Sequence, residues 1–578
     1  MFDHLIRGGF VVDGTGMPGR RADIGIRAGR IEQIGTLNGA DATNTFDATG
    51  LVVTPGFIDI HTHYDAQLHW DGYATPSSLH GVTTVIGGNC GFTLAPLKQR
   101  DADYTRRMMA QVEGMPLAAL EEGLDWSWET FGDYLSRLDG RVAVNAGFLV
   151  GHCAIRRYVL GDASIEREAT PTEVDEMVAL LHESLAAGGL GFSTTRSRTH
   201  PDHLGGPVPS RQASEGEVLA LCRAVADHPG TTLEAITSGC ISGFNEEEIE
   251  LFAQMSAHAG RALNWNVLNI GGASAGTADE DETWARIAHQ LRPSARAREI
   301  GGRVLALTMP TQADLNMSMA TYCAMWLIPG WREVLTLPPA EKAAKLRDPE
   351  VRATMLASAV GSGLERFAEF GSYRIGDTVA AANKQYEDRL VRDIAEERGV
   401  DAWDALVDIE IADDFNTVLW PEPADDERLE MRVELWRRDD VMLGGSDAGA
   451  HLDRMLGSTY TTTFLADVLR GRKPIPLEEA VQLMTSKPAE VYGLRDRGVL
   501  REGAIADVVV FDPETVGSAR ARRAYDLPGD SLRLTAASSG VELVLVNGVE
   551  TIVAGEPTGA LAGTVLRSGR DTETVPTR

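Results

Sequence analysis

Two histidines end a short apolar segment near the N-terminus. In the run IDIHTH at residues 58–63, His61 and His63 are two positions apart, and residues i and i+2 of a strand point to the same face. Two imidazoles that converge at a strand end supply half of the ligands of a zinc site. Packing histidines are the alternative interpretation, but an apolar strand rarely needs two polar side chains at its tip. The spacing therefore predicts a metal site.

A second candidate is Asp447, which ends the apolar run DVMLGGSD at residues 440–447. Catalytic residues of barrel enzymes collect where parallel strands end. Taken alone, a Ser-Asp pair before a helix also serves as an N-cap. The choice between these roles depends on the elements that surround Asp447.

The elements expected to position these residues follow a regular rhythm. Apolar runs of four to eight residues, each followed by a Gly- or Asp-bearing turn and a longer helical pattern, are typical of βα units around a buried parallel sheet. Eight such runs predict an α/β fold of the (β/α)8 TIM-barrel type; they lie at 56–63, 82–88, 142–152, 189–195, 231–237, 262–270, 303–310 and 440–447.

The interval before the last run is too long for a loop. Residues 312–438 are therefore predicted to form a helical insertion, with two helices within 337–360. An insertion at this end of a barrel strand is expected to act as a lid.

Both ends of the chain have a different pattern. Residues 4–35 alternate apolar and polar positions between Gly-rich turns, and 498–512 and 541–559 do the same, which indicates short antiparallel strands. We predict a small β-sandwich domain that both termini build together. The expected domains are 1–54 plus 485–565 for the sandwich, 55–484 for the barrel, and 566–578 for a C-terminal tail.

Composition narrows the choice of partners. The chain has 578 residues and a net charge of −30, and so acidic a surface repels nucleic acid and anionic lipid. It has five cysteines and no CxxC, which favours a reducing compartment over a disulfide framework. It contains no run of eighteen apolar residues. We expect a cytoplasmic protein that has no membrane or nucleic-acid partner and that can form a homo-oligomer.

Several motifs together resemble one known family. They are TPGFIDIHTH at 54–63, GGNCGF at 87–92, LVGH at 149–152 with Arg156, GLGFST at 189–194, SDA at 446–448, GAIADVVVFD at 503–512 and VNG at 546–548. This pattern is similar to the amidohydrolase superfamily, within it the N-acyl-D-amino-acid deacylase (D-aminoacylase) group. The resemblance covers most of the chain but is weak between about 210 and 440. It implies a zinc-dependent barrel hydrolase that cleaves an amide bond in a small N-acyl amino acid.

The resemblance also implies roles for particular residues. His61 and His63 correspond to metal ligands of the first strand, and Cys90 to the thiolate that this group uses where other amidohydrolases place a carboxylated lysine. Asp447 corresponds to the last-strand carboxylate that binds metal and accepts a proton from the attacking water. The positions of the few lysines support this assignment of Cys90, because none lies at the end of the fourth strand, where a carboxylated lysine would be needed. A buried inert thiol remains the alternative for Cys90.

The chain departs from the family pattern in strands five and six. Relatives carry a histidine at each strand end, whereas this chain has Glu234 in strand five and Asn264 and Asn266 in strand six. Glu234 is a candidate metal ligand, with a salt-bridge role as the alternative. Asparagine binds zinc poorly, so we expect one tightly bound Zn²⁺ and a second ion that is weak or absent. The alternative donors are His152, His200, His203 and His451, of which His152 is typical of a hydrogen-bonded core residue and His200 and His203 of a solvent-facing loop.

A second departure concerns substrate binding. Relatives place an aromatic residue after the fourth strand, whereas this chain reads TRSRT at 195–199. Arg198 and Arg454 are candidate partners of a substrate carboxylate, because guanidinium binds carboxylate in a bidentate manner. Either arginine can instead pair with surface acids.

Three other functions stay open at this stage. One is hydrolysis of a cyclic amide, and another is hydrolysis of an ester or a larger acyl amide. The third is a binding protein with a degenerate metal site, since two family histidines are missing.

Overall fold

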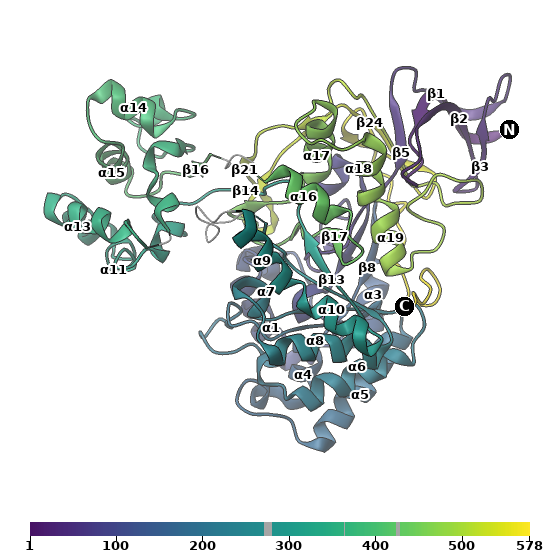
Figure 1. Cartoon of the computed structure of the whole chain (residues 1–578), viewed down its shortest axis with the longest axis horizontal. Helices are drawn as coiled ribbons and strands as arrows, with labels where there is room; N and C mark the ends of the chain where they lie inside the picture. Colours follow the sequence, from purple (N-terminus) through teal and green to yellow (C-terminus); the bar gives the residue numbers. More distant parts are fainter. Residues whose placement is uncertain (271–279, 363, 423–427, 578) are drawn as a thin grey trace. The chain divides into compact units, whose positions relative to one another are not determined.

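The computed structural model describes residues 1–270, 280–362, 364–422 and 428–577. The chain divides into two compact units. The first comprises residues 1–269, 284–313 and 429–578, and the second comprises 270–283 and 314–428. Figure 1 shows the elements of both units in chain order by colour.

Parallel strands form the centre of the first unit, and every predicted apolar run contains one. A three-stranded sheet joins β6 (Phe57–Asp59), β7 (Val82–Gly87) and β8 (Asn145–Phe148). A six-stranded sheet has the order β17-β13-β12-β11-β10-β9. Its strands are β9 (Val150–Gly151), β10 (Gly191–Thr195), β11 (Thr232–Ile236), β12 (Ala262–Trp265), β13 (Arg303–Thr308) and β17 (Val441–Leu443).

The strands thus form two sheets, whereas the sequence predicted one closed sheet of eight. The third predicted strand is interrupted at Leu149, which separates β8 from β9, although the Leu149 N–H still donates to the Gly87 carbonyl at 3.0 Å. The remaining edge strands of the two sheets are β6 and β17. Just after them, Thr62 and Ala448 form an isolated parallel bridge. The His63 N–H donates to the Ala448 carbonyl at 2.7 Å. The first and last strands of the series therefore end side by side.

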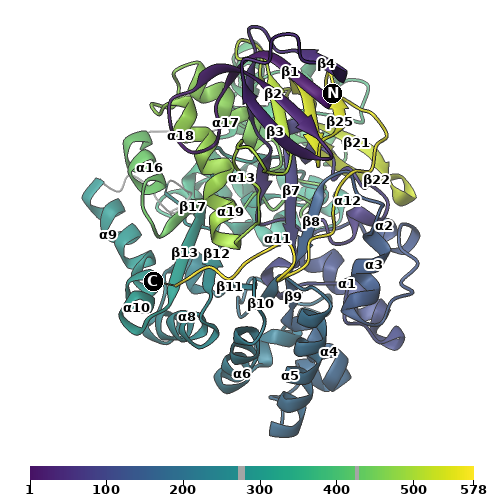
Figure 2. The same cartoon turned by 90° about the vertical axis from the view of Figure 1, so that its right-hand side faces the viewer.

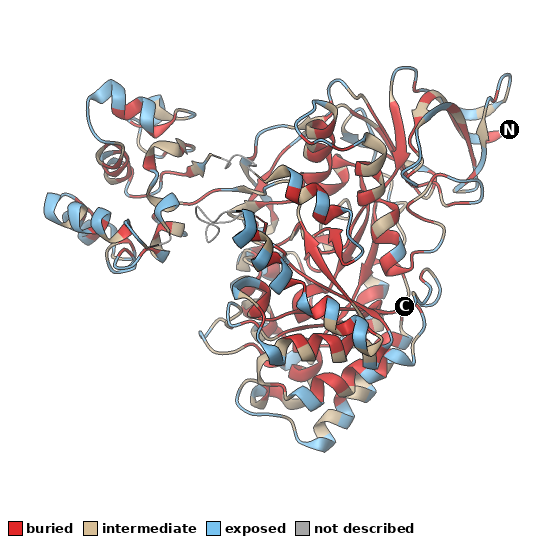
Figure 3. Ribbon diagram, viewed as in Figure 1, coloured by how far each residue is buried: buried red, intermediate tan, exposed pale blue. Residues whose placement is uncertain are grey.

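Amphipathic helices cover the outer side of these strands, among them α5 (Pro171–Ala186), α6 (Glu215–Ala226), α8 (Glu246–Ala259) and α10 (Arg292–Ile300) (Figure 2). Helix α5 begins in a capping box, in which Thr170 and Glu173 satisfy each other's backbone N–H groups. The strands are buried, whereas each helix alternates buried and exposed positions (Figure 3). The parallel strands therefore form the core, and their carboxyl ends are free to carry functional side chains.

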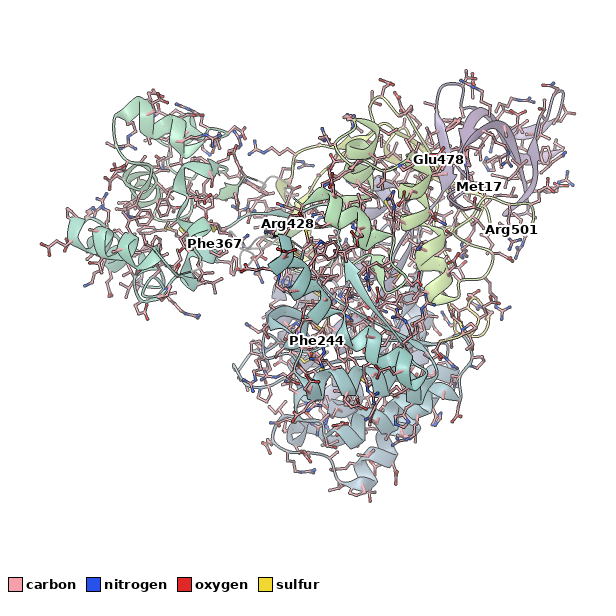
Figure 4. All side chains as sticks on the ribbon, viewed as in Figure 1. Met17, Phe244, Phe367, Arg428, Glu478 and Arg501 are labelled. Atoms are coloured by element: carbon pink, nitrogen blue, oxygen red, sulfur yellow. The ribbon has the colours of Figure 1, made fainter. Side chains whose placement is uncertain are left out.

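Both ends of the chain contribute to one further sheet. Its order is β26-β25-β24-β19-β5-β1-β2-β3, with β4 paired to β1. The N-terminal strands are β1 (Phe2–Val11), β2 (Arg20–Arg27), β3 (Arg30–Gly35), β4 (Ala42–Asp47) and β5 (Val52–Pro55). The C-terminal strands are β19 (Val508–Phe511), β24 (Val541–Val546), β25 (Val549–Val553) and β26 (Glu556–Pro557). Glu478, in α18 (Leu477–Met484), accepts a hydrogen bond from the Gly19 N–H at 3.0 Å (Figure 4).

The second unit is mainly helical and has its own apolar core. Trp403 packs against Phe370 and Trp331, with ring centroids 4.5 and 5.2 Å apart. Two helices, α12 (Pro339–Leu346) and α13 (Pro349–Ala359), confirm the prediction for 337–360. The others include α14 (Val391–Arg398) and α15 (Ala402–Ala412). Residue 363 and residues 423–427 of the predicted insertion lie outside the described residues.

Candidate metal centre

Two neighbouring strand ends bring three of the strongest sequence candidates together. His61 and His63 follow β6, and Cys90 follows β7. One ligand atom from each of these three buried side chains lies within 4.8 Å of the other two. His61 Nε2 is 3.6 Å from the Cys90 Sγ.

Asp447, beyond the end of β17, completes the cluster. Its Oδ1 lies 3.2 Å from His61 Nε2 and 3.8 Å from His63 Nε2. Burial alone disfavours the charged carboxylate, but the hydrogen bond and charge of His61 and the charges of His63 and His451 outweigh it and lower the pKa of Asp447 to about 2. The same carboxylate raises the pKa of His61 against the opposing effect of burial. Asp447 is therefore ionised throughout the neutral range.

The backbone around Cys90 is held in a tight turn. Cys90 has a φ of 55°, between Gly88 at 74° and Gly91 at 77°, a left-handed conformation that favours glycine at the flanking positions. Ser193, in β10, donates to the Gly88 carbonyl and accepts from the Gly91 N–H at 3.1 Å. The Cys90 N–H donates to Glu234 Oε2 at 2.6 Å. These contacts fix the direction of the thiol.

Glu234 is buried beside the cluster rather than paired on the surface. Burial raises its pKa to about 7, although the charge of His61 and the Cys90 N–H oppose this effect. Its second oxygen, Oε1, is buried and has no hydrogen-bond partner among the described residues. No ion pair of Glu234 occurs in the described part of the chain, so the salt-bridge interpretation has no support there.

The two asparagines of strand six have different environments. The Asn264 amide donates to the Leu233 carbonyl and the Tyr492 hydroxyl, both at 3.1 Å. Asn264 is therefore a hydrogen-bonded core residue. Asn266 Oδ1 lies 4.0 Å from the Cys90 Sγ. Between them in the chain, the Trp265 ring packs edge to face on Phe244, with centroids 5.1 Å apart. Only Asn266 therefore reaches the cluster from this strand.

Two buried carboxylates beside the histidines escaped the sequence analysis. Glu113, at the end of α1 (Ala102–Val112), is 4% exposed, and its Oε2 lies 3.5 Å from His63 Nδ1. Asp59 accepts from the Ser446 hydroxyl at 2.5 Å and from the His61 N–H at 3.5 Å. Neither residue stands out in the sequence, because an acid inside an apolar strand or at a helix end does not by itself indicate a metal site.

The environment of the cluster favours a cation. Burial raises the pKa of the Cys90 thiol well above its usual range, and the charges of Glu234, Glu113 and Asp447 raise it further. Burial also raises the pKa of Glu113 and lowers that of His63 to about 3. A divalent ion reverses these effects, because it stabilises thiolate and carboxylate and binds neutral imidazole. Imidazole, thiolate and carboxylate are also the donor types that zinc prefers, so these residues fit the ion.

The alternative histidine donors divide into two pairs. His152 uses both ring nitrogens, with Thr194 Oγ1 and Glu217 Oε1 each at 2.9 Å, and is a core residue. His203 packs edge to face on Tyr104. His200 and His451, in contrast, interact electrostatically with Asp447. The prediction that His200 faces solvent holds only in part, because the residue is half-buried and its ring packs beside Phe92, with centroids 5.4 Å apart.

The two arginines predicted to bind substrate lie near these histidines. Arg198 is exposed, and its backbone N–H donates to the Ser238 hydroxyl at 3.0 Å. Arg454 Nη2 lies 3.2 Å from His451 Nδ1, and its Nη1 lies 3.2 Å from Asp453. Neither guanidinium contacts His61, His63 or Cys90 among the contacts described.

Parallel strands whose carboxyl ends carry two imidazoles, a thiol and a carboxylate define a metal-dependent α/β hydrolase. A model of the amidohydrolase family matches residues 44–558, so the chain belongs to this family and is a hydrolase of carbon–nitrogen bonds other than peptide bonds. Over the described residues, every helix is too short or too polar to cross a membrane.

Three proteins illustrate what this chain is similar to. D-aminoacylase of Alcaligenes xylosoxydans xylosoxydans is 30% identical over 576 residues, which cover 98% of this chain and 97% of that protein. A solved D-aminoacylase, with a binuclear metal center that shows one-metal activation and second-metal attenuation, is 27% identical with a TM-score of 0.62 over 98% of this chain and 100% of that one. N-acyl-D-glutamate deacylase of Bordetella bronchiseptica, solved with zinc and a phosphonate inhibitor that mimics the tetrahedral intermediate, is 27% identical with a TM-score of 0.61 over 98% and 99%.

Proposed function

We propose that this chain is a zinc-dependent deacylase of N-acyl amino acids, with N-acyl-D-amino acids as the preferred substrates. One observation carries the proposal: His61, His63 and Cys90 form a buried set of three donors, and the Asp447 carboxylate lies 3.2 Å from the nearest of them. Catalytic zinc sites use three protein ligands and keep a fourth position for water or substrate.

His61, His63 and Cys90 are the proposed ligands, and Asp447 lies at the edge of the same site. Zinc, when bound there, supplies a more acidic water and polarises the scissile carbonyl. Glu113 Oε2 lies 3.5 Å from His63 Nδ1, the position from which a carboxylate orients a ligating histidine. Glu234 holds the turn of Cys90 and offers its second oxygen to the metal.

Asp447 is the proposed base. Its low pKa keeps it ionised, so it can accept the proton of the attacking water and return it to the leaving nitrogen. The left-handed backbone at Asp447, with a φ of 51°, aims this side chain at His61 and His63.

We propose one tightly bound zinc per chain. A D-aminoacylase relative is activated by one metal and attenuated by a second, so one ion is sufficient in that protein. In this chain, Glu234 and Asn266 stand where the family has imidazoles, and oxygen donors hold zinc less tightly. The substrate carboxylate is assigned to Arg198 or Arg454.

The order of strands supports a closed barrel over residues 55–484. The bridge between Thr62 and Ala448 is the contact that closure requires. The sheet that both ends share supports a separate domain of residues 1–54 and 485–565. All five cysteines are free and buried, which fits the reducing cytoplasm.

The test compares wild type with His61→Ala. Purified wild type is assayed on N-acetyl-D- and N-acetyl-L-amino acids, and its zinc is measured after dialysis. We expect hydrolysis that prefers the D-series and depends on zinc, and an inactive His61→Ala protein without zinc but with a similar Tm. Retention of zinc by His61→Ala contradicts the assigned site, and wild type that hydrolyses none of these amides contradicts the substrate class.

A further inference from the structure

The residue before Cys90 is tied to the segment that carries the two histidines. Asn89 is fully buried, and its side-chain nitrogen donates to the Thr62 carbonyl at 3.1 Å and to the Ile86 carbonyl at 2.9 Å. Both partners are carbonyl oxygens, which only accept hydrogen bonds, so the orientation of the amide is unambiguous. Thr62 stands between the two histidines. One side chain therefore joins the turn of the thiol to the segment of the imidazoles.

The backbone completes this connection. The Thr62 N–H donates to the same Ile86 carbonyl at 3.0 Å, and Ile86 lies in β7, the strand that leads to Cys90. Asn89 therefore bridges two carbonyl groups on neighbouring segments of the chain. The distance of 3.6 Å between His61 Nε2 and Cys90 Sγ depends on how these two segments are held together.

The residue before Asp447 makes a comparable contact. Ser446 is buried, and its hydroxyl donates to Asp59 Oδ2 at 2.5 Å. The hydroxyl oxygen accepts from the Ala448 N–H at 3.1 Å. The first bond reaches the last residue of β6, the strand that leads to the histidines, and the second closes a turn around Asp447. The direction of this carboxylate is therefore tied to the same strand.

A buried asparagine at the opposite end of the strands has the same chemistry without this placement. Asn145 is the first residue of β8, and its amide donates to the Thr83 carbonyl at 3.1 Å and to Asp507 Oδ2 at 3.0 Å. The metal cluster lies beyond the carboxyl ends of the parallel strands, whereas Asn145 lies at an amino end. Asn145 therefore separates the cost of losing a buried amide from an effect on the cluster.

We propose that Asn89 and Ser446 are positioning residues that align Cys90 and Asp447, respectively, with the two histidines. This role rests on the proposed zinc site. Metal affinity includes the free energy needed to order the ligands, so a thiol that is already held beside imidazole binds the ion more tightly. A base must lie within hydrogen-bond reach of the proton that it accepts. Asn89 therefore acts on metal binding, and Ser446 acts on proton transfer.

Replacing Asn89 tests the link to the metal. Asn89→Leu keeps the approximate size of the side chain but removes both donors, so zinc affinity should fall about 10- to 100-fold, as on loss of other groups that orient ligands. Competition with a chelator measures this loss. In protein loaded with Co²⁺ instead of zinc, the absorption band of the thiolate–cobalt bond should weaken or shift. Asn145→Leu should lower Tm but leave the zinc affinity and this band unchanged.

Replacing Ser446 tests the link to the base. Ser446→Ala should keep its zinc and its KM but lower kcat by up to about 10²-fold, the cost of misplacing a reactive group by about 1 Å. Ser256→Ala is the matched control and should keep the kcat of wild type. The Ser256 hydroxyl is also buried and donates to the Arg261 carbonyl at 2.7 Å, but it belongs to α8, on the outer side of the strands.

Double variants distinguish positioning from general support of the fold. Residues that act through one another are not additive. In the Cys90→Ala protein, Asn89→Leu should therefore cause no further loss of zinc affinity. In the Asp447→Asn protein, Ser446→Ala should cause no further loss of kcat. Asn89→Ser, which has a single donor, replaces Asn89→Leu if that protein does not fold.

Several outcomes overturn the role of the residue concerned and leave the zinc site intact. They are wild-type zinc affinity in the Asn89 variant, wild-type kcat in Ser446→Ala, equal losses in the matched controls, and additive losses in the double variants. Wild type that binds no zinc or hydrolyses no N-acyl amino acid overturns the proposed function and this role together.

Discussion

Asp447 Oδ1 lies 3.2 Å from His61 Nε2, so the first and last strands of the parallel series place a base and an imidazole in contact. The pairing of Thr62 with Ala448, one residue beyond each of them, fixes this distance through the backbone. The contact lowers the pKa of Asp447 and raises that of His61. The two strand ends therefore hold the carboxylate and the imidazole together before substrate binds.

Replacing Asp447 by Asn should remove the base and preserve its size. We expect kcat of Asp447→Asn to fall by about 10²–10⁴, the contribution of a general base, while substrate still binds. Steady-state kinetics at matched zinc content measure this. An unchanged kcat would show that another group takes the proton.

Replacing Cys90 should affect zinc more than replacing any other cysteine. Cys90→Ala removes a thiolate donor, so zinc measured after dialysis should fall well below one equivalent. Cys153→Ala, Cys222→Ala and Cys240→Ala are matched controls, because these thiols are equally buried but lie outside the cluster. If all four variants retain zinc equally, Cys90 is a packing thiol.

Glu234→Gln tests both the metal count and the support of Cys90. Wild type should hold close to one zinc per chain after extensive dialysis, and Glu234→Gln should lower activity because the variant loses a negative charge beside the ion. Metal analysis and kcat are the readouts. Two equivalents of zinc in wild type, both kept by the variant, would show that the ligands lie elsewhere.

Glu113→Gln should weaken metal binding without removing a ligand. Loss of a carboxylate that orients a ligating histidine usually costs 10- to 100-fold in metal affinity, and titration with a competing chelator measures this loss. Glu121→Gln, an exposed acid on α2 (Leu117–Glu122), is the control. Equal zinc affinity in both variants would leave His63 oriented by packing alone.

Glu217→Gln should destabilise the fold rather than the chemistry. Glu217 is buried and binds His152 at 2.9 Å and Arg156 at 2.8 Å, so the variant leaves Arg156 unpaired at a cost of about 3–5 kcal/mol. The surface variant Glu173→Gln, which breaks an ion pair with Arg167, should cost about 1 kcal/mol or less. Urea denaturation compares the two.

The contacts of Glu217 with His152 and Arg156 also predict how the stability of the fold depends on pH. Burial opposes the charge of Glu217, but the hydrogen bond and charge of His152 and the charge of Arg156 outweigh it and lower its pKa below the ordinary value of 4.5. A lowered pKa in the folded state stabilises the protein above that value, and the contribution is lost as the pH falls through the lowered pKa. Wild type should therefore lose more stability in acid than Glu217→Gln does. Parallel acid denaturation curves would contradict this.

The sequence by itself determined the features that depend on local order. Alternation in IDIHTH placed His61 and His63 on one face, and each of the eight apolar runs contains a strand of the two central parallel sheets. These patterns are readable because the periods of strand and helix appear directly in the chain. Family motifs added Cys90 and Asp447 to the same site.

Only the tertiary structure decided the rest. It brought Glu113 to His63 and linked Glu234 to the Cys90 N–H, contacts between residues far apart in the chain that no period encodes. It divided the parallel strands between two sheets at Leu149 and placed the His200 ring beside Phe92. Burial and orientation depend on which loops pack together, and the pKa values, tautomers and hydrogen bonds of a site follow from that packing rather than from residue type.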